Sequence, residues 1–184
     1  MRLDLGLSNE IRAELTQNLN IIINAAASMD FDEQIDVAIR LNTTGALLLL
    51  KLAEESPNIE AFLQVSTTTV NCDRTGYVEE TLYDSGIDWH AEYNKLVTMS
   101  KRDLFAQQKI ILGKFPNAHC YTKRMTEHLL QSNNDKGIPI VIMRPSILGA
   151  ALNEPVPGWT DTTNFISGIT LIVGLGILTQ MPCK

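Results

Sequence analysis

Short apolar runs alternate with longer amphipathic segments along most of the chain. The run NIIINAAAS (20–28) is rich in β-branched residues and ends in small ones, which predicts a buried strand of a parallel sheet. The segment 31–56 has acidic residues at its start and apolar residues at helical spacing, so it predicts a helix. The run IEAFLQVSTTTV (59–70) predicts a second strand that ends in hydroxyl residues.

The second half of the chain continues this alternation. Residues from 71 to about 99 are polar and irregular and predict a loop, and a helix is expected within 100–112. A further helix is expected over 118–131, and GIPIVIMRPSILG (137–149) predicts a third buried strand. Strands that alternate with helices predict an α/β fold with a parallel sheet and flanking helices. Ligands of such sheets bind at the carboxyl ends of the strands, where the small and hydroxyl residues of this chain stand.

Composition narrows the function classes. The formal net charge of -6 argues against a nucleic-acid binder, because phosphate neutralisation needs a basic surface. The three cysteines, Cys72, Cys120 and Cys183, form no CxxC pair, which argues against a disulfide framework or a zinc site and favours a reducing compartment. The apolar segment 165–178 is shorter than the roughly 20 residues that cross a bilayer, so a buried or interfacial position is expected.

The stretch HCYTK (119–123) suggests redox chemistry. A tyrosine and a lysine four residues apart on a helix lie on one face, where the lysine ammonium favours the phenolate and eases proton transfer to a reduced carbonyl. Here Lys123 is present, but His119 occupies the position four residues earlier. Tyr121 lies about 200° around the helix from Lys123 and is expected to face away. Cys120 and His119 are neighbours on the helix and are not expected to pair.

Several phrases together resemble the fatty acyl-CoA reductases, members of the extended short-chain dehydrogenase/reductase group with a male-sterility-type NAD-binding domain. They are NAAASMDFDE, VSTTTVNCDRTGYVEETLY, YTKRMTEHLL and IVIMRPSILGAALNEPVPGW, and the match runs from about Leu5 to about Gly176. The resemblance implies a Rossmann domain that binds NADPH and reduces a long-chain fatty acyl-CoA, through the aldehyde, to the fatty alcohol. It also implies an intracellular protein with peripheral association to the peroxisomal or endoplasmic-reticulum membrane, and it leaves the oligomeric state open.

The resemblance assigns site residues one by one. Thr67, with Ser66 beside it, falls at the hydroxyl position, and Lys123 falls at the lysine position. The tyrosine position holds His119, which either ends the activity or serves as a substitute proton donor. A histidine cation beside Lys123 is disfavoured, so His119 is expected to be neutral. The resemblance places a further set at the cofactor: Ala25, Ala26, Asn42, Lys123, Pro145 and Ser146. For Asn42, a purely local hydrogen bond within its own helix is the alternative.

A second departure concerns the pyrophosphate. The family has a Gly-rich loop between its first strand and first helix, but no such motif precedes the strand predicted at 20–28. The late GLGILT (174–179) lacks the third glycine. We therefore expect residues 1–184 to form a single partial domain from the middle of a longer reductase. The alternatives are a non-catalytic remnant or truncated product without cofactor binding, and an epimerase or dehydratase, against which VNCDR and EPVPGW argue.

Overall fold

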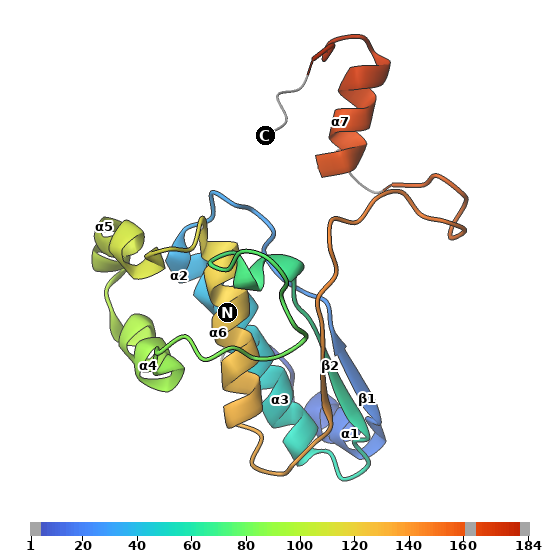
Figure 1. Cartoon of the computed structure of the whole chain (residues 1–184). Coiled ribbons are helices and arrows are strands. Elements are labelled where there is room, and N and C mark those ends of the chain that lie inside the picture. Colours follow the sequence, from blue (N-terminus) through green and yellow to red (C-terminus); the bar gives the residue numbers. More distant parts are fainter. Residues whose placement is uncertain (1–4, 161–164, 181–184) are drawn as a thin grey trace. The chain divides into compact units, whose positions relative to one another are not determined.

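The computed structural model describes residues 5–160 and 165–180 (Figure 1). The chain divides into two compact units, the first ending at Arg144 and the second beginning at Pro145. The three strands and most of the candidate site residues belong to the first unit. Cys183 lies outside the described residues.

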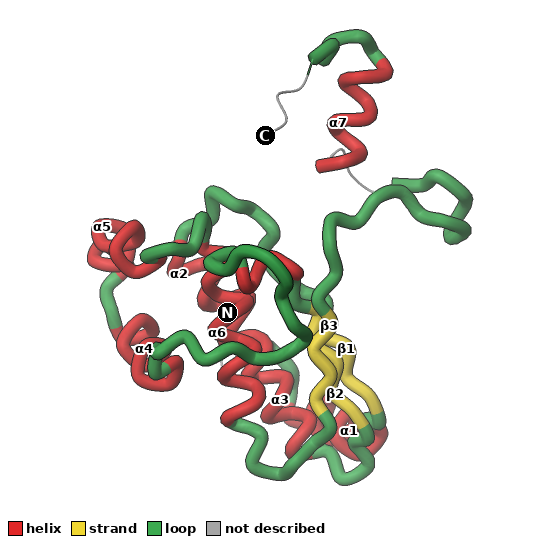
Figure 2. Tube along the Cα trace, in the orientation of Figure 1, coloured by secondary structure: helices red, strands yellow, loops and turns green. Residues whose placement is uncertain are grey.

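The first unit contains a parallel sheet of three strands in the order β1-β2-β3 (Figure 2). The strands are β1 (Ile21–Asn24), β2 (Ala61–Val65) and β3 (Ile140–Met143). Ile23 pairs with Leu63, and Leu63 pairs with Val141. The predicted parallel α/β sheet is confirmed, although each strand is shorter than the apolar run that predicted it.

The helices of the first unit are α1 (Asn9–Asn18), α2 (Ile35–Ala38), α3 (Gly45–Glu55), α4 (Trp89–Thr98), α5 (Lys101–Leu112) and α6 (Ala118–Ser132). A π-helix, η1 (Ile39–Thr44), joins α2 to α3, so the helix predicted over 31–56 contains one wide turn. Such turns occur often at functional sites. A short 3-10 helix, η2 (Thr68–Asn71), follows β2.

The loop predicted from 71 to 99 was wrong at its end, because α4 occupies residues 89–98. The side chain of Asp88 caps this helix by accepting a hydrogen bond from the N–H of Ala91. Only Trp89 and Leu96 of α4 are buried, so its apolar stripe is narrow. The helix α1 was also missed; it begins at a Ser8 cap and buries no residue.

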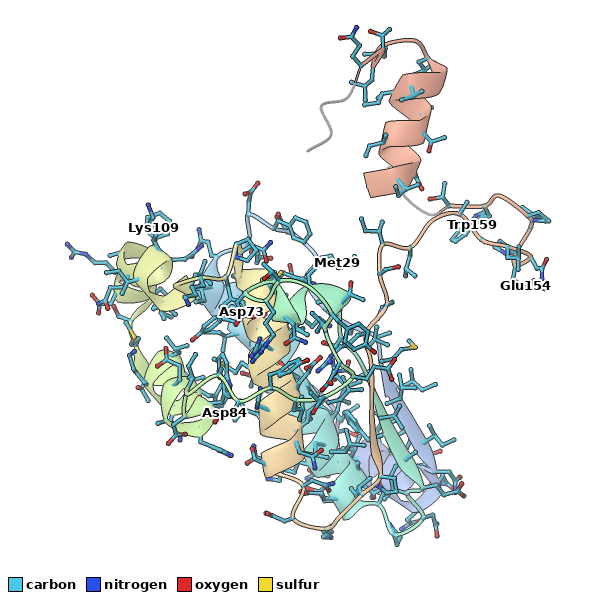
Figure 3. All side chains as sticks on the ribbon, viewed as in Figure 1. Met29, Asp73, Asp84, Lys109, Glu154 and Trp159 are labelled. Atoms are coloured by element: carbon cyan, nitrogen blue, oxygen red, sulfur yellow. The ribbon has the colours of Figure 1, made fainter. Side chains whose placement is uncertain are left out.

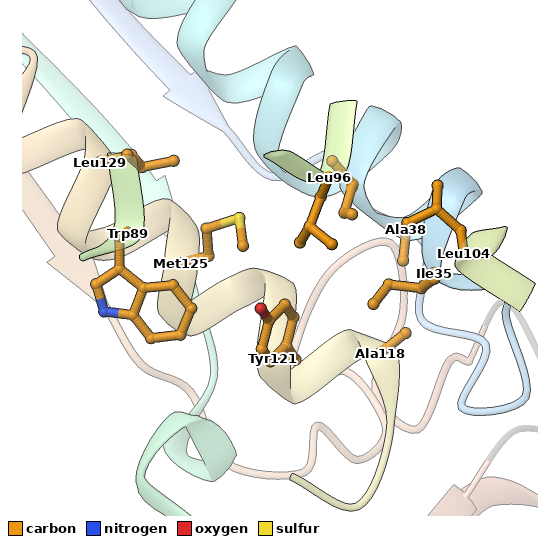
Figure 4. Close-up of a cluster of buried hydrophobic side chains, with 10 residues drawn as sticks. Ile35, Ala38, Trp89, Leu96, Leu104, Ala118, Tyr121, Met125 and Leu129 are labelled. Atoms are coloured by element: carbon orange, nitrogen blue, oxygen red, sulfur yellow. The ribbon is translucent and has the colours of Figure 1, made fainter. Parts of the chain in front are cut away.

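Two apolar clusters lie on either side of α6. One cluster joins α6 to α2, α4 and α5 through residues that include Ile35, Leu96, Leu104, Tyr121 and Met125 (Figure 4). The other joins α6 and α3 to the sheet through Leu50, Phe62 and Leu130. Burying one such side chain stabilises the fold by about 1.5–3 kcal/mol. Because both sides are packed, only His128, Gln131 and Ser132 of the fifteen residues of α6 escape burial.

The sheet is covered on one face within the first unit. Ile22 and Phe62 point into the cluster beneath α3 and α6. On the opposite face, Ile23 of β1 is 66% exposed and Val141 of β3 is 50% exposed. This face is apolar across all three strands, since Leu63 lies between these two residues in the register.

The second unit consists of a loop followed by α7 (Phe165–Gly174). Within the loop, Ala151 donates its N–H to the carbonyl of Trp159 at 2.7 Å, and Gly158 donates back to Ala151 at 2.9 Å. The apolar segment predicted at 165–178 is thus partly helical. Within residues 5–160 and 165–180, no helix combines the length and the apolar character needed to cross a bilayer.

Candidate active site

Lys123 is anchored at the carboxyl end of β2. The side chain of Asn117 accepts the N–H of Cys120 at 2.9 Å and so starts α6 one residue before His119. The Nζ of Lys123, a residue only 3% exposed, donates to the carbonyl of Val65 at 2.7 Å. Burial lowers the pKa of Lys123 to about 8, and Glu127, one turn further along, opposes the shift. Lys123 is therefore a buried cation fixed by a hydrogen bond to Val65, and it is not a solvated helix residue.

The two hydroxyl residues after β2 have different surroundings. The Oγ of Ser66 is buried and has no hydrogen-bond partner among the residues that the structure describes. The backbone N–H of Ser66 donates to the carbonyl of Met143 at 2.7 Å, which fixes the residue against β3. Thr67 instead caps η2, where its Oγ1 accepts the N–H of Thr69 at 3.3 Å. A buried hydroxyl without a partner costs about 1–3 kcal/mol, so Ser66 is the hydroxyl that is free to bond a ligand.

His119 lies on the same helix face as Lys123 and is 7% exposed. Its Nδ1 is 2.9 Å from the carbonyl oxygen of Ser28, in the loop after β1. Burial lowers the pKa of His119 below 6.5, the hydrogen bond to Ser28 opposes this, and Lys123 adds to the lowering. The imidazole is therefore neutral at neutral pH, as the sequence led us to expect.

Tyr121 faces away from this group, also as expected. Its hydroxyl donates to Glu92 of α4 at 3.1 Å, and its ring meets Trp89 edge-on at 5.5 Å (Figure 4). Burial, helped by the nearby Glu92 carboxylate, raises the pKa of Tyr121 far above its usual value of 10.0. Tyr121 is thus a core residue of α6 and faces away from Lys123.

Asn42 holds two segments together from within η1. Its Oδ1 accepts the N–H of Ser28 at 2.8 Å. Its Nδ2 donates to the carbonyl of Ser28 at 3.4 Å and to the hydroxyl of Thr122 at 3.0 Å. The alternative of a local bond within its own helix was wrong, because every partner of Asn42 here lies outside η1. No hydrogen bond joins Asn42 directly to Lys123 among the described contacts.

The remaining predicted cofactor residues fall into two groups. Ala25 and Ala26 follow β1 directly and are exposed, so their small side chains leave open space at the strand end. The neighbouring Asn24 is buried and donates to the side chain of Gln64 at 2.8 Å. Pro145 and Ser146 open the second unit, and their assignment to the cofactor stays a prediction.

Sequence reasoning missed the buried charges of α6. Glu127 accepts two hydrogen bonds from Arg144, at 2.9 Å and 2.7 Å. Arg124 donates to Asp73 at 2.9 Å and to Asn71 at 3.0 Å; Figure 3 shows Asp73 beside α6. These bonds tie the chain after η2 and the end of β3 to the helix that carries His119. The sequence offered one sign of these buried charges: charged residues stand between apolar residues at successive turns of this helix.

A cleft of about 550 Å3 opens beside these elements. It is lined by Thr68 of η2, by Ile142 and Met143 of β3, by Arg144, and by the segment 78–82. Neither His119 nor Lys123 is among the lining residues.

A parallel sheet whose strands alternate with helices defines a Rossmann-like fold, and solved structures agree. The chain resembles a thiolation-reductase di-domain from an archaeal non-ribosomal peptide synthetase, with a TM-score of 0.57 and 24% identity over 91% of this chain and 40% of that chain. It also resembles the UDP-glucuronic acid 4-epimerase from Bacillus cereus in complex with NAD, with a TM-score of 0.52 and 19% identity over 82% and 38% of the two chains. Both likenesses establish the fold alone.

The sequence relatives are more specific. The profile of the NAD-binding family described as male sterility protein matches residues 1–184, and the chain belongs to this family. It is 35% identical to fatty acyl-CoA reductase 1 of Gallus gallus over 97% of its length, and 33% identical to fatty acyl-CoA reductase 2 of Bos taurus over 95%. In both cases the chain spans 34% of the relative, about a third of its length.

Proposed function

We propose that the chain supplies the catalytic part of a reductase that uses NADPH to convert long-chain fatty acyl-CoA to fatty alcohol, in lipid metabolism. The observation that carries the proposal is the pairing of Lys123 with the end of β2, directly beside the unpartnered hydroxyl of Ser66. The named relatives are fatty acyl-CoA reductases, and this supports the choice of substrate. Peripheral association with the peroxisomal or endoplasmic-reticulum membrane belongs to the same proposal.

The residues present fit a nicotinamide nucleotide. The hydroxyl of Ser66 is an orphaned polar atom at the strand end, and Ala25 and Ala26 leave space at the neighbouring end. Lys123 would bind the ribose of the nucleotide, while Asn42 holds the loop after β1 in place. Pro145 and Ser146 would complete the lining. When bound, NADPH supplies the hydride; its choice over NADH rests on the resemblance to the reductases.

The protein groups have separate tasks in this scheme. Ser66 and Thr67 are the two hydroxyls that could donate to the carbonyl oxygen of the substrate, and of the two only Ser66 has no partner within residues 5–160 and 165–180. Lys123 places a positive charge near that oxygen, where negative charge develops as the hydride arrives. His119 stands where the proton donor is needed, one helical turn before Lys123.

The second candidate is a chain that has lost reduction. The observation that favours it is the state of His119, which is neutral and already uses the hydrogen on Nδ1 to bond Ser28. A neutral imidazole in this state has no second hydrogen to give to the substrate.

The test is oxidation of NADPH in the presence of palmitoyl-CoA. It should be run on the 184-residue chain and on any longer natural polypeptide that contains it, with His119→Tyr and Lys123→Met variants of each. We expect activity that Lys123→Met abolishes and His119→Tyr increases. If a His119→Tyr form binds NADPH and palmitoyl-CoA and still turns neither over, the reductase function is wrong.

A further inference from the structure

Helix α5 is attached to the first unit along one of its sides. Leu104 is buried, and Ile111 and Leu112 pack against the same apolar cluster. The side chain of Gln108 accepts the backbone N–H of Ile35 at 3.1 Å, which fixes α5 against α2. The sheet lies on the other side of α6 from α5 (Figure 1). The opposite side of α5 is therefore a fixed outer surface, separate from the exposed face of the sheet.

This outer surface combines large apolar side chains with basic ones. Phe105 is 70% exposed and Ile110 is 79% exposed. At about 100° for each residue, Arg102, Phe105 and Lys109 fall within about 60° of one another, and Ile110 follows directly after Lys109. Figure 3 shows Lys109 on the outer side of the helix, and Arg102 is exposed as well. We call these four residues the outer face of α5.

The charge of this region is opposite to that of the rest of the chain. Residues 101–114 contain four basic residues and one acidic residue, a formal charge of +3, which leaves -9 of the total of -6 for the remainder. Within residues 5–160 and 165–180, neither Arg102 nor Lys109 forms an ion pair. The one acid, Asp103, accepts the hydroxyl hydrogen of Ser100 at 2.6 Å at the start of the helix. The two cations of the outer face are thus available to an external anion.

Exposed apolar and basic side chains on one helix face suit an anionic bilayer surface. Apolar side chains enter the boundary between head groups and acyl chains, while long basic side chains keep their charges at the phosphates. A single exposed apolar residue is common and needs no explanation, but here two large ones flank two unpaired cations. A convex helix face also matches a deformable lipid surface better than a folded protein, which would need a complementary hollow.

We propose that the outer face of α5 binds a bilayer that contains anionic phospholipid. The inference deepens the peripheral membrane association of the proposed function, on which it rests for the presence of a membrane, and it names the surface that makes the contact. Phe105 and Ile110 enter the head-group region, and Arg102 and Lys109 bind lipid phosphates. The negative charge on the remainder of the chain is repelled by the same lipids, so the chain binds with α5 towards the membrane.

The first measurement is co-sedimentation of the 184-residue chain with phosphatidylcholine vesicles that contain about a third phosphatidylserine. We expect the partition coefficient to be about tenfold lower for vesicles of phosphatidylcholine alone. It should also fall as NaCl is raised from roughly 0.05 M to roughly 0.5 M, because salt screens the attraction. Absence of binding overturns the proposal. Equal binding to both kinds of vesicle also overturns it, because an uncharged apolar segment such as α7 would then make the contact.

Matched pairs of variants test which residues make the contact. Lys109→Gln should lower the partition coefficient about fivefold, whereas Lys51→Gln removes the same charge from an exposed position on α3 and should leave it unchanged. Ile110→Ser should lower it about fivefold, whereas Ile11→Ser on α1, also at an exposed isoleucine, should not. Because all four side chains are exposed, the variants should fold normally. Equal losses in the α5 variants and their controls overturn the assignment to α5.

Phe105→Trp tests whether the outer face enters the bilayer. The added indole should emit at shorter wavelength when vesicles bind, and lipids with brominated acyl chains should quench it. The same spectra of the unaltered chain give the contribution of Trp89 and Trp159, the two native tryptophans. An indole at position 105 that is neither shifted nor quenched, in a chain that sediments with the vesicles, overturns the insertion of Phe105.

Membrane binding and reduction can fail separately. A chain that oxidises NADPH with palmitoyl-CoA but does not sediment with anionic vesicles overturns this inference alone. A chain that binds the vesicles through α5 but oxidises no NADPH overturns the reductase function alone. The Lys109→Gln and Ile110→Ser variants should keep the unaltered rate of NADPH oxidation with decanal in the absence of vesicles, because the outer face is not part of the candidate active site. A loss of this rate in both variants overturns a role limited to the membrane.

Discussion

Arg144 and Glu127 form a two-point ion pair that joins the end of β3 to the middle of α6. The Nε and Nη2 atoms of Arg144 lie 2.9 Å and 2.7 Å from the two carboxylate oxygens of Glu127. The carboxylate is almost fully buried, at 2% side-chain exposure. Glu127 also lies one turn from Lys123. Its carboxylate therefore interacts electrostatically with Lys123 as well as with Arg144.

Loss of this pair should destabilise the fold strongly. In Arg144→Met the carboxylate of Glu127 stays buried without its main partner, which should lower the free energy of unfolding by about 3 kcal/mol. Arg12→Met is the matched control, because Arg12 pairs with Glu55 at the surface and should cost less than about 1 kcal/mol. Urea denaturation of the two variants measures the difference. Equal losses would mean that the buried pair adds nothing beyond a surface contact.

Stability should rise with pH because of Lys123. The folded chain loses the lysine proton near pH 8, whereas the unfolded chain keeps it until about 10.5. The unfolded state therefore holds more protons in this window, and raising the pH favours the folded state. Between pH 7 and 9 the gain should be about 1 kcal/mol, at about 1.4 kcal/mol for each unit above the folded pKa.

The comparison with Lys123→Met isolates the effect of that lysine. The variant should lack the rise in stability between pH 7 and 9. The measurements stop at pH 9 because Cys72 acts in the opposite sense above it. Burial raises the pKa of this thiol from 9.0 to about 11 in the folded chain. The unfolded chain therefore loses the thiol proton first, and a further rise in pH lowers the free energy of unfolding. Parallel curves for the two proteins would contradict a desolvated lysine at this position.

His119→Tyr should increase the rate of reduction. A phenol keeps a transferable proton at neutral pH, and a positioned proton donor contributes about a hundredfold or more to such steps. NADPH oxidation with decanal measures the gain in polypeptides that bind the nucleotide. Tyr121→Phe serves as the control, since it removes only the bond to Glu92 and should leave the rate unchanged. A larger effect from Tyr121→Phe than from His119→Tyr would place the donor elsewhere.

Removing each of the two hydroxyls after β2 should affect different properties: one substitution should lower turnover and the other should lower stability. Ser66→Ala removes a buried group without a partner, so the free energy of unfolding should stay the same or increase slightly while turnover falls about tenfold. Thr67→Ala removes the cap of η2 and should cost about 1 kcal/mol of stability. Thermal unfolding and substrate turnover, measured on both variants, check this. A fall in turnover for Thr67→Ala alone would assign the orienting hydroxyl to Thr67.

Much of the fold follows from local patterns. The three strands and α6 were predictable because parallel strands are apolar throughout and because the apolar positions of α6 recur at helical spacing. The helix α4 escaped prediction because only Trp89 and Leu96 are buried, and Tyr93 adds a partly buried contact, so its apolar stripe is narrow. The π-helix at 39–44 has no pattern of its own, since one wide turn hardly disturbs a helical periodicity.

The candidate site was predictable in part. The i, i+4 spacing placed Lys123 and His119 on one face, and the rotation of Tyr121 away from them followed from the same geometry. The contacts of Ser28 were not predictable, because Ser28 meets Asn42 and His119 across 14 and 91 residues of chain. Such distant contacts depend on how the helices pack, which no local pattern encodes.

The burial of α6 on both sides has an evolutionary consequence. The helix that presents His119 and Lys123 also fills the space between the two apolar clusters, so few of its positions can vary without loss of stability. A substitution at 119 that ends catalysis and one that loosens the core would look alike in any survey of tolerated changes. Changes at the buried positions of this helix are therefore confined to side chains of similar size.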